Sequence, residues 1–408
     1  MLDNRQILEK IELKRNIWDV VDYVNNVFKM ALDRNASDIH IEPTEKFLLI
    51  RYRQDGDFFM IDKLDKENVS PIITRLKVLS KVKIDENKKP QDWKIVYFYD
   101  RDQKNIDIRV STLPTSYWEK MVLRLLRPDE TLTSLDKLGF IDLNMEKIKK
   151  SLTSSYWIIL VAWPTWSWKS TTLFWILKNF NPLDLNISTL EDPIEYNIDF
   201  VNQSQVKPEI WFTFATWLRS LVRQDPDIIM VWEIRDKETA TLAVEAALTW
   251  HLVLSTIHTN TATATVQRLI NMGVEPFLLS SAMRMVISQR LIKRVCQNCK
   301  KPKDLPPHVL KTVRDYLYPI MDKQEVDNLV FYEWTWCEVC NWSWYKWRMW
   351  VHEVLIIESY LEEMILNRAT ANEMTDLARK HWMLTIIQDA FIKSAMWLTT
   401  IEESLQLI

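Results

Sequence analysis

Apolar residues recur with two different periods along the first part of the chain, and together they predict a small domain of helices and strands. Helical spacing runs over residues 20–32 and again over residues 71–82. Strand-like alternation is found at residues 38–41, 47–61, 106–114 and 120–127. The second of these segments, FLLIRYRQDGDFFMI, is typical of a hairpin because an Asp-Gly pair stands at its centre.

The rest of the chain alternates short apolar strands with helical segments, which predicts a mostly parallel sheet. The predicted strands are IILVA at residues 158–162, NISTL at 186–190, DIIMV at 227–231 and HLVLSTIH at 251–258. From Ile357 the pattern is helical to the end. A linker is predicted around RPDETLTSLDKLGF, and we place the domain boundary near residue 145, so that the domains span residues 1–145 and 146–408.

Length and charge narrow the classes of function. The 408 residues suffice for two or more domains, and a net charge of −3 gives no indication of a nucleic-acid partner. The longest apolar stretch, Tyr156 to Trp163, is too short to cross a membrane, and the first residues lack a signal-peptide core. We therefore expect a cytoplasmic protein without direct membrane insertion.

Glycine is scarce and tryptophan is abundant in this chain. It contains 3 Gly and 20 Trp, whereas a usual glycine content of roughly 7% would give about 29. The tryptophans fall where turns are expected, as in EWTWCEVCNWSWYKWRMW at residues 333–350. We interpret most of them as glycine positions, encoded by UGA codons that the organism reads as glycine. Trp18, in a helical pattern, is the exception, and a Trp-rich binding surface is the alternative.

The segment VAWPTWSWKSTT at residues 161–172 becomes a phosphate-binding loop of the pattern G-x-x-x-x-G-K-[ST] when its tryptophans are read as glycines. Such a loop wraps a polyphosphate with consecutive backbone N–H groups, in conformations that only glycine adopts easily. Lys169 would then reach the β- and γ-phosphates of ATP, and Ser170 would ligate Mg²⁺. The predicted nucleotide-binding residues are Trp163, Pro164, Thr165, Trp166, Ser167, Trp168, Lys169, Ser170 and Thr171.

Acidic residues and histidines follow the predicted strands. Glu233 comes after an apolar strand, where it could act on Mg²⁺ or on the attacking water. Glu191 and Glu195 belong to EDPIE after another strand, where they could hold a metal or a water. The alternative for these carboxylates is a solvated loop. His251 and His258 flank a buried strand and could sense the γ-phosphate, although such a pair is more often structural.

Four cysteines form two C-x-x-C pairs, Cys296 with Cys299 and Cys337 with Cys340. Two such pairs suit tetrahedral thiolate coordination of Zn²⁺. Because all four positions would be filled, the metal would be structural. Four reduced free thiols are the alternative.

These motifs in this order resemble the secretion ATPase family that drives type IV pilus assembly and type II secretion, of the PilB/GspE type. The matching blocks include ASDIHIEP, RYRQDGDF, KPQDW, TLEDPIEY, QDPDIIMVWEIRD, ALTWHLVLSTIHTN and both cysteine pairs. The resemblance covers nearly the whole chain. Family glycines fall on Trp93, Trp118, Trp217, Trp232 and Trp250, which supports the interpretation of the tryptophans.

The resemblance implies a PAS-like N-terminal domain, a RecA-like ATPase domain with a zinc module at about residues 296–345, and a helical C-terminus. It makes EDPIE the Asp box, Glu233 the Walker B carboxylate, and His251 and His258 the His box. Arg109 and Arg124 match arginines that approach the phosphates when the N-terminal domain closes. Members commonly carry a further N-terminal domain that docks on an inner-membrane partner, and we expect either that this form is short or that its start is incomplete.

By the same resemblance the protein is a homo-hexameric ring at the inner face of the cytoplasmic membrane. It would use ATP, Mg²⁺ and a structural Zn²⁺, and would push on an inner-membrane platform protein. One alternative is a pilus retraction motor, against which the cysteine module argues. The other is a catalytically inactive ring scaffold, which genuine tryptophans would require.

Overall fold

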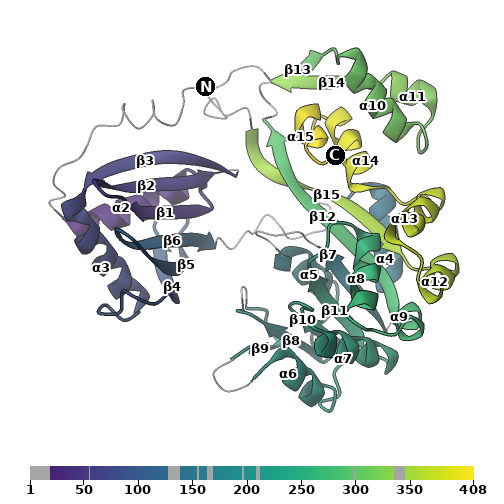
Figure 1. Cartoon of the computed structure of the whole chain (residues 1–408), viewed down its shortest axis with the longest axis horizontal. Helices are drawn as coiled ribbons and strands as arrows, with labels where there is room; N and C mark the ends of the chain where they lie inside the picture. The colour runs from purple at the N-terminus through teal and green to yellow at the C-terminus, as the bar shows by residue number, and fades with distance from the viewer. Residues whose placement is uncertain are drawn as a thin grey trace. The chain divides into compact units, whose positions relative to one another are not determined.

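The computed structural model describes residues 19–54, 56–126, 138–153, 156–162, 169–194, 197–207, 212–296, 298, 300–334 and 345–408 (Figure 1). Two compact units divide the chain, Met1–Asp129 and Glu130–Ile408. The predicted boundary near residue 145 falls within helix α4 (Asp142–Leu152) of the second unit. The helix belongs there because Met145 and Ile148 are buried in the core of that unit.

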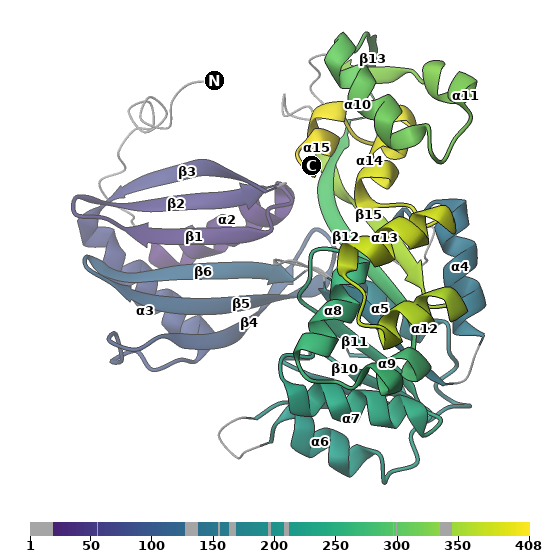
Figure 2. The same ribbon diagram turned by 45° about the vertical axis from the view of Figure 1, so that its right-hand side comes forward.

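The first unit is a six-stranded antiparallel sheet with two helices on one face (Figure 2). Its elements are α2 (Val20–Asp33), β1 (Asp38–Pro43), β2 (Phe47–Gln54), β3 (Asp57–Asp65), η1 (Lys66–Asn68), α3 (Val69–Ser80), β4 (Gln91–Tyr99), β5 (Lys104–Thr115) and β6 (Trp118–Leu126). The strand order is β3-β2-β1-β6-β5-β4. Phe28 of α2 and Leu76 of α3 are buried against Ile50 and Ile108 of the sheet, so alternate strand residues face the helices.

The second unit is built on a seven-stranded sheet of order β15-β12-β7-β11-β10-β8-β9. Its strands are β7 (Trp157–Ala162), β8 (Ile187–Glu191), β9 (Asn202–Gln205), β10 (Ile228–Val231), β11 (Leu252–Ile257), β12 (Met283–Val295) and β15 (Tyr345–Ile356). Neighbouring strands are parallel except β12 and β15. The mostly parallel sheet predicted from the sequence is thus confirmed.

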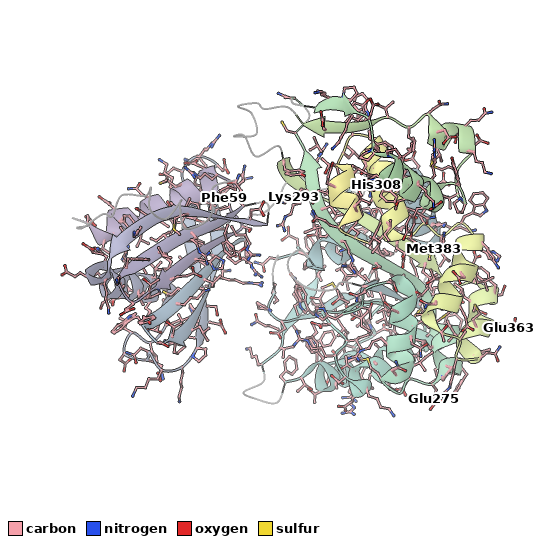
Figure 3. All side chains as sticks on the ribbon, turned by 45° about the horizontal axis from the view of Figure 1, so that its top comes forward. Phe59, Glu275, Lys293, His308, Glu363 and Met383 are labelled. Carbon is pink, nitrogen blue, oxygen red and sulfur yellow. The ribbon has the colours of Figure 1, made fainter. Side chains whose placement is uncertain are left out.

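Helices cover both faces of this sheet, as a parallel sheet requires. Helix α4 and α5 (Lys169–Lys178) bury their apolar residues on one face. The other face is covered by α6 (Phe214–Leu221), α7 (Lys237–Leu248), α8 (Ala262–Asn271), α9 (Pro276–Ala282), α12 (Ser359–Leu366) and α13 (Ala371–Lys380). Side chains fill the space between these layers (Figure 3).

The C-terminal part adds a small antiparallel pair and more helices. These elements are β13 (Lys300–Lys303), α10 (Pro307–Leu317), α11 (Lys323–Asp327), β14 (Phe331–Trp334), α14 (Ile386–Ala395) and α15 (Ile401–Leu405). The helical prediction from Ile357 onward is confirmed. Capping boxes begin α13 at Thr370 and α14 at Thr385.

Three tryptophans occupy the position that follows a helix C-cap, where the chain turns through a left-handed conformation. Trp250, Trp382 and Trp397 have φ angles of 71°, 64° and 68°. In each case the next backbone N–H donates to a helix carbonyl, as His251 N does to Ala246 O. This is the Schellman arrangement, which strongly favours glycine.

In the described part of the chain, every helix is either too short or too polar to traverse a lipid bilayer.

Candidate nucleotide site

Several predicted site residues follow the carboxyl ends of the parallel strands, so they lie at one edge of the sheet. The strand ends are aligned, since Val231 of β10 pairs with Leu190 of β8 and with Ser255 of β11. Strand β7 ends at Ala162, directly before the predicted phosphate loop, and α5 begins directly after it. Ligands of open α/β sheets bind at this edge.

The loop itself, residues 163–168, lies outside the described residues. Lys169 and Ser170 are the first residues of α5, and their side chains also lie outside the description. Thr171 is buried, and Thr172 donates from its hydroxyl to Gln289 Oε1 of β12 at 2.8 Å. A strand therefore ends directly before the predicted phosphate loop and a helix begins directly after it, as such a loop requires.

Glu233 is the best-defined acidic residue of this edge. Its side chain is buried, with Oε1 2.8 Å from Nε2 of His258, and Oε2 accepts from Nη2 of Arg235 at 2.8 Å. The backbone around it is fixed on both sides, because Trp232 N donates to Leu190 O and Ile234 N donates to Thr256 O. A carboxylate held in this way has a defined orientation toward a metal or a water.

Two further carboxylates were predicted to lie here. Glu191 ends β8 and is fully buried, and its Oε1 accepts from the hydroxyl of Thr189 at 2.7 Å and from Nε2 of Gln203 at 2.8 Å. Glu195 lies outside the described residues. Glu191 is thus one strand away from the β10 end that leads to Glu233.

The structure brings only one of the two histidines to this edge. His258 follows the end of β11 and contacts Glu233, whereas His251 precedes the start of β11. The six residues of β11 separate the two histidines. A separation of seven residue steps at about 3.3 Å per step places them roughly 23 Å apart. His251 Nδ1 instead lies 2.8 Å from the carbonyl oxygen of Ala246.

The two predicted arginines lie in the first unit, directly opposite each other on β5 and β6. Arg109 and Arg124 are on the sheet face away from α2 and α3, since their neighbours in sequence fill the core under those helices. Nε of Arg124 donates to Oδ1 of Asp38 at 3.1 Å, and Arg53 stands opposite Asp38 on the other side.

Three residues of these clusters were not predicted from the sequence. Arg235 binds the carboxylate of Glu233, and Asp38 and Arg53 extend the row of Arg109 and Arg124 across the sheet. Strand alternation could have placed Asp38 and Arg53 on the same face as the two arginines. Arg235 stands two positions after Glu233, so the same alternation could have placed the two side chains on one side of the chain.

Of the predicted zinc ligands, only Cys296 is described; it is buried and follows β12. Cys299, Cys337 and Cys340 lie outside the described residues. Strands β13 and β14 pair Lys300 with Trp334, so the chain segments that lead to the two cysteine pairs are neighbours. In the described ranges no group of three or more His, Cys, Asp or Glu side chains could hold a metal ion.

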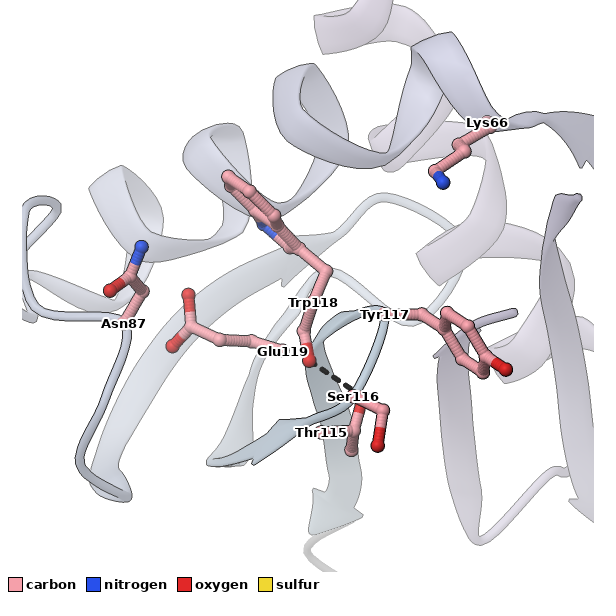
Figure 4. Close-up of a pocket in the computed structure, with 7 residues that line it drawn as sticks. All are labelled: Lys66, Asn87, Thr115, Ser116, Tyr117, Trp118 and Glu119. Carbon is pink, nitrogen blue, oxygen red and sulfur yellow. Dashed lines mark hydrogen bonds between the residues drawn. The ribbon is translucent and has the colours of Figure 1, made fainter. Parts of the chain in front are cut away.

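The first unit contains a cavity of about 490 Å³, lined by Lys66, Asn87 and residues 115–119 (Figure 4). The hydroxyl of Thr115 donates to the carbonyl oxygen of Trp118 at 2.6 Å, which closes the turn between β5 and β6. Trp118 has a φ of 145°. None of the predicted site residues lines this cavity, so we do not assign the nucleotide to it.

Comparison with known proteins identifies the family. Residues 15–406 match the family described as type II/IV secretion system protein. Similar curated proteins include the type IV pilus assembly ATPase PilB of Thermus thermophilus, 40% identical over 94% of this chain and 42% of its own length. The type II secretion system ATPase E of Vibrio cholerae is 40% identical over 94% of this chain and 74% of its own length.

Solved structures share the fold. The ATPase DotB of Legionella pneumophila superposes with a TM-score of 0.69 at 21% identity, covering 97% of this chain and 98% of DotB. The pilus retraction motor PilT with bound ADP gives a TM-score of 0.63 at 24% identity, covering 94% and 96%. The second unit thus has the RecA-like fold of secretion ATPases.

The chain belongs to the type II/IV secretion system protein family, and by this membership to the class of secretion ATPases. It spans less than half of the Thermus relative and about three quarters of the Vibrio relative.

Proposed function

We propose that this chain is the Mg²⁺-dependent ATP hydrolase of a homo-hexameric motor that assembles a type IV pilus or a type II secretion pseudopilus. The observation that carries the proposal is the buried Glu233, bound to His258 and Arg235 at the sheet edge where β7 leads into the phosphate-loop segment. One curated relative is named for type IV pilus assembly and the other for type II secretion, so the proposal covers both machines.

Phosphoryl transfer needs a neutralised γ-phosphate and a positioned water. In our proposal Lys169 contacts the β- and γ-phosphates, Ser170 binds Mg²⁺, and the amides of the loop hold the remaining charge. Glu233 orients the metal and the water, with His258 reporting the state of the γ-phosphate. If Glu233 does not have this role, Glu191 and Glu195 are the next candidates for it. A role for His251 stays a prediction.

Arg109 and Arg124 complete the site from the N-terminal domain, which we continue to interpret as PAS-like. An arginine supplied by a closing domain stabilises charge on the transferring phosphoryl group. Their position on the sheet face away from α2 and α3 supports this role, because long cationic side chains there can meet a ligand outside the unit.

We further propose that the four cysteines bind one structural Zn²⁺. The pairing of Lys300 with Trp334 supports it, because Cys299 directly precedes one strand and Cys337 closely follows the other. Four thiolates would fill the tetrahedral sites and leave none for water.

The ring would act as a peripheral protein at the cytoplasmic face of the inner membrane, on the platform protein of the machine. Relatives that bear pilus-assembly and secretion names support this setting. Light scattering of the Mg-ATP-bound protein at micromolar concentration should show six copies per particle, and monomers at that concentration would oppose the hexamer.

The enzyme is tested with a chain that carries glycine at positions 163, 166 and 168. Glu233→Gln should keep Mg-ATP affinity within about twofold and lower turnover at least 100-fold, because the amide keeps the shape but not the charge. Glu245→Gln on the exposed side of α7 is the control and should hydrolyse at the parent rate. Equal turnover in Glu233→Gln and the parent would refute the assignment of Glu233.

The second candidate is a catalytically inactive ring scaffold, favoured if the indoles of the phosphate loop are genuine. The codons decide between the two: UGA at 163, 166 and 168 supports the motor, and UGG supports the scaffold. The chain with tryptophan at these positions should bind no ATP, since indoles would fill the space for the phosphates. A retraction motor is the third candidate, and the cysteine module argues against it.

A further inference from the structure

We propose that Glu353 is a positioning residue that holds His258 against Glu233 and links this contact to helix α14. The inference rests on the function proposed above, because it concerns the same pair of side chains. Glu353 lies on β15, opposite Ser288 of β12, and is buried. It therefore acts through the backbone around the site.

One carboxylate accepts from the first residues of two helices. Oε1 of Glu353 accepts the backbone N–H of Ala262, which begins α8, at 2.7 Å. Glu353 also accepts the backbone N–H of Ile386, which begins α14. Because helix N-termini carry unpaired N–H groups and a partial positive charge, both ends favour an acidic partner.

The short segment between His258 and Ala262 transmits this constraint to the site. Thr261 caps α8 by accepting from Ala264 N, and the hydroxyls of Thr259 and Thr265 lie 2.6 Å apart. From β12, the hydroxyl of Ser288 and Nη2 of Arg290 both donate to the carbonyl oxygen of Asn260 at 3.4 Å. We infer that a shift at the start of α8 moves His258, whose ring contacts Glu233.

Helix α14 is also bound to β15 at His352, the residue before Glu353. Oδ2 of Asp389 accepts from the backbone N–H of His352 at 2.9 Å and from Nζ of Lys393 at 2.5 Å, and Lys393 also donates to Trp350 O. All of these groups are buried. The start of α14 and the start of α8 are thus joined through adjacent residues of β15, so a displacement of α14 reaches His258 through Glu353.

The test uses Glu353→Gln in the chain with glycine in the phosphate loop, at pH 8. The amide group presents one acceptor oxygen and one donor nitrogen, so it cannot serve both helix ends as the carboxylate does. We expect kcat to fall about tenfold with Mg-ATP affinity changed less than twofold. The matched control is Glu403→Gln, a buried carboxylate that accepts the backbone N–H of Lys293 away from this edge, and it should keep the parent kcat.

A double-mutant cycle separates positioning from general loss of stability. If Glu353 acts through His258, then adding Glu353→Gln to His258→Asn should lower kcat by less than twofold beyond His258→Asn alone. Additive tenfold effects would overturn the inference while leaving the role of Glu233 intact. Failure of Glu233→Gln to reduce turnover would instead strike the proposed function.

Hydrogen exchange gives a readout that needs no turnover. Glu353→Gln should speed amide exchange at least fivefold at the N-termini of both α8 and α14, and Glu403→Gln should change neither. Unchanged protection at residues 260–264 in Glu353→Gln would overturn the inference even if kcat fell.

Discussion

At the scale of single residues, positive φ angles mark positions that favour glycine, and Asn35 and Arg368 occupy two further positions of this kind. All three glycines of the chain have positive φ, and so do Trp118, Trp250, Trp382 and Trp397. Gly273 ends α8 with the same bond pattern that Trp250, Trp382 and Trp397 show at their helices, since Val274 N donates to Leu269 O. The interpretation of tryptophan as glycine is thereby supported at these positions. At Trp217 and Trp232, which are buried, φ makes no such demand.

Replacing Trp250 or Trp382 by glycine should stabilise the protein. Each indole is largely exposed, and a left-handed non-glycine residue costs about 1 kcal/mol or more. We expect each variant to raise the free energy of unfolding by about 1 kcal/mol in urea titration. Trp175→Gly is the contrast, because its indole is buried inside α5, and it should cost about 3 kcal/mol or more. Destabilisation by Trp250→Gly and Trp382→Gly would contradict the interpretation.

Glu353 makes stability depend on pH. Burial raises the pKa of Glu353 from 4.5 to about 7. Between these values the folded carboxyl keeps its proton while the unfolded one loses it, so this group's contribution to stability falls as pH rises from 4.5 to 7. Urea titrations from pH 4 to 8 should show the parent losing about 3 kcal/mol relative to Glu353→Gln. A pH-independent difference would contradict the raised pKa.

At the scale of elements, the sequence predicted the strands that carry the site and missed several others. Strands β7, β8, β10 and β11 are continuous apolar runs because helices bury both of their faces. Strand β4 is an edge strand whose exposed positions include apolar residues such as Val96 and Phe98, so its apolar run does not alternate with polar residues. Strand β12 begins at Met283, directly after α9 ends at Ala282, without a turn residue to mark the change.

The same reasoning separates the predictable part of the site from the rest. Glu233 and His258 follow strand ends, so their meeting at one sheet edge could be inferred from the alternation of strands and helices. Glu353 contacts Ala262, which lies 91 positions earlier in the chain. Glu353 belongs to β15, and the tryptophan-rich sequence at the start of this strand hid its strand pattern. His251 was grouped with His258 because both flank one buried strand and because the resemblance makes them the His box, but that strand places the two at opposite edges of the sheet.

Removal of the metal from the proposed zinc module should lower the stability of the protein without removing a catalytic group. Protein purified without chelator should contain one Zn²⁺ per chain by elemental analysis, because four thiolates bind it tightly. Chelation should lower the melting temperature by several degrees, and excess Zn²⁺ should restore it. Replacing Cys299 and Cys337 by serine should reproduce the loss, whereas absence of zinc from the purified protein would contradict the module.

At the scale of the whole molecule, the predicted site residues are divided between two compact units. Glu233, His258 and the phosphate-loop segment belong to the second unit, and Arg109 and Arg124 belong to the first. In the proposed motor, binding of the nucleotide and completion of the site are therefore separate steps. In that proposal the arginines would act only when the first unit closes on a nucleotide, which would couple hydrolysis to movement.

Two substitutions should separate these steps in the chain with glycine in the phosphate loop. Lys169→Ala should weaken Mg-ATP binding at least tenfold, because a direct phosphate contact is lost. Arg109→Ala should leave affinity within about threefold and lower phosphate release at least tenfold, because its contact forms only after closure. Arg109 is the cleaner choice, since removing Arg124 would also strip Asp38 of its ion pair. Arg101→Ala, an exposed arginine of the same unit paired with Asp33, is the control and should match the parent. If Arg109→Ala weakened binding as much as Lys169→Ala while Arg101→Ala did not, the arginine would contact the nucleotide before closure, and the two-step order would be wrong.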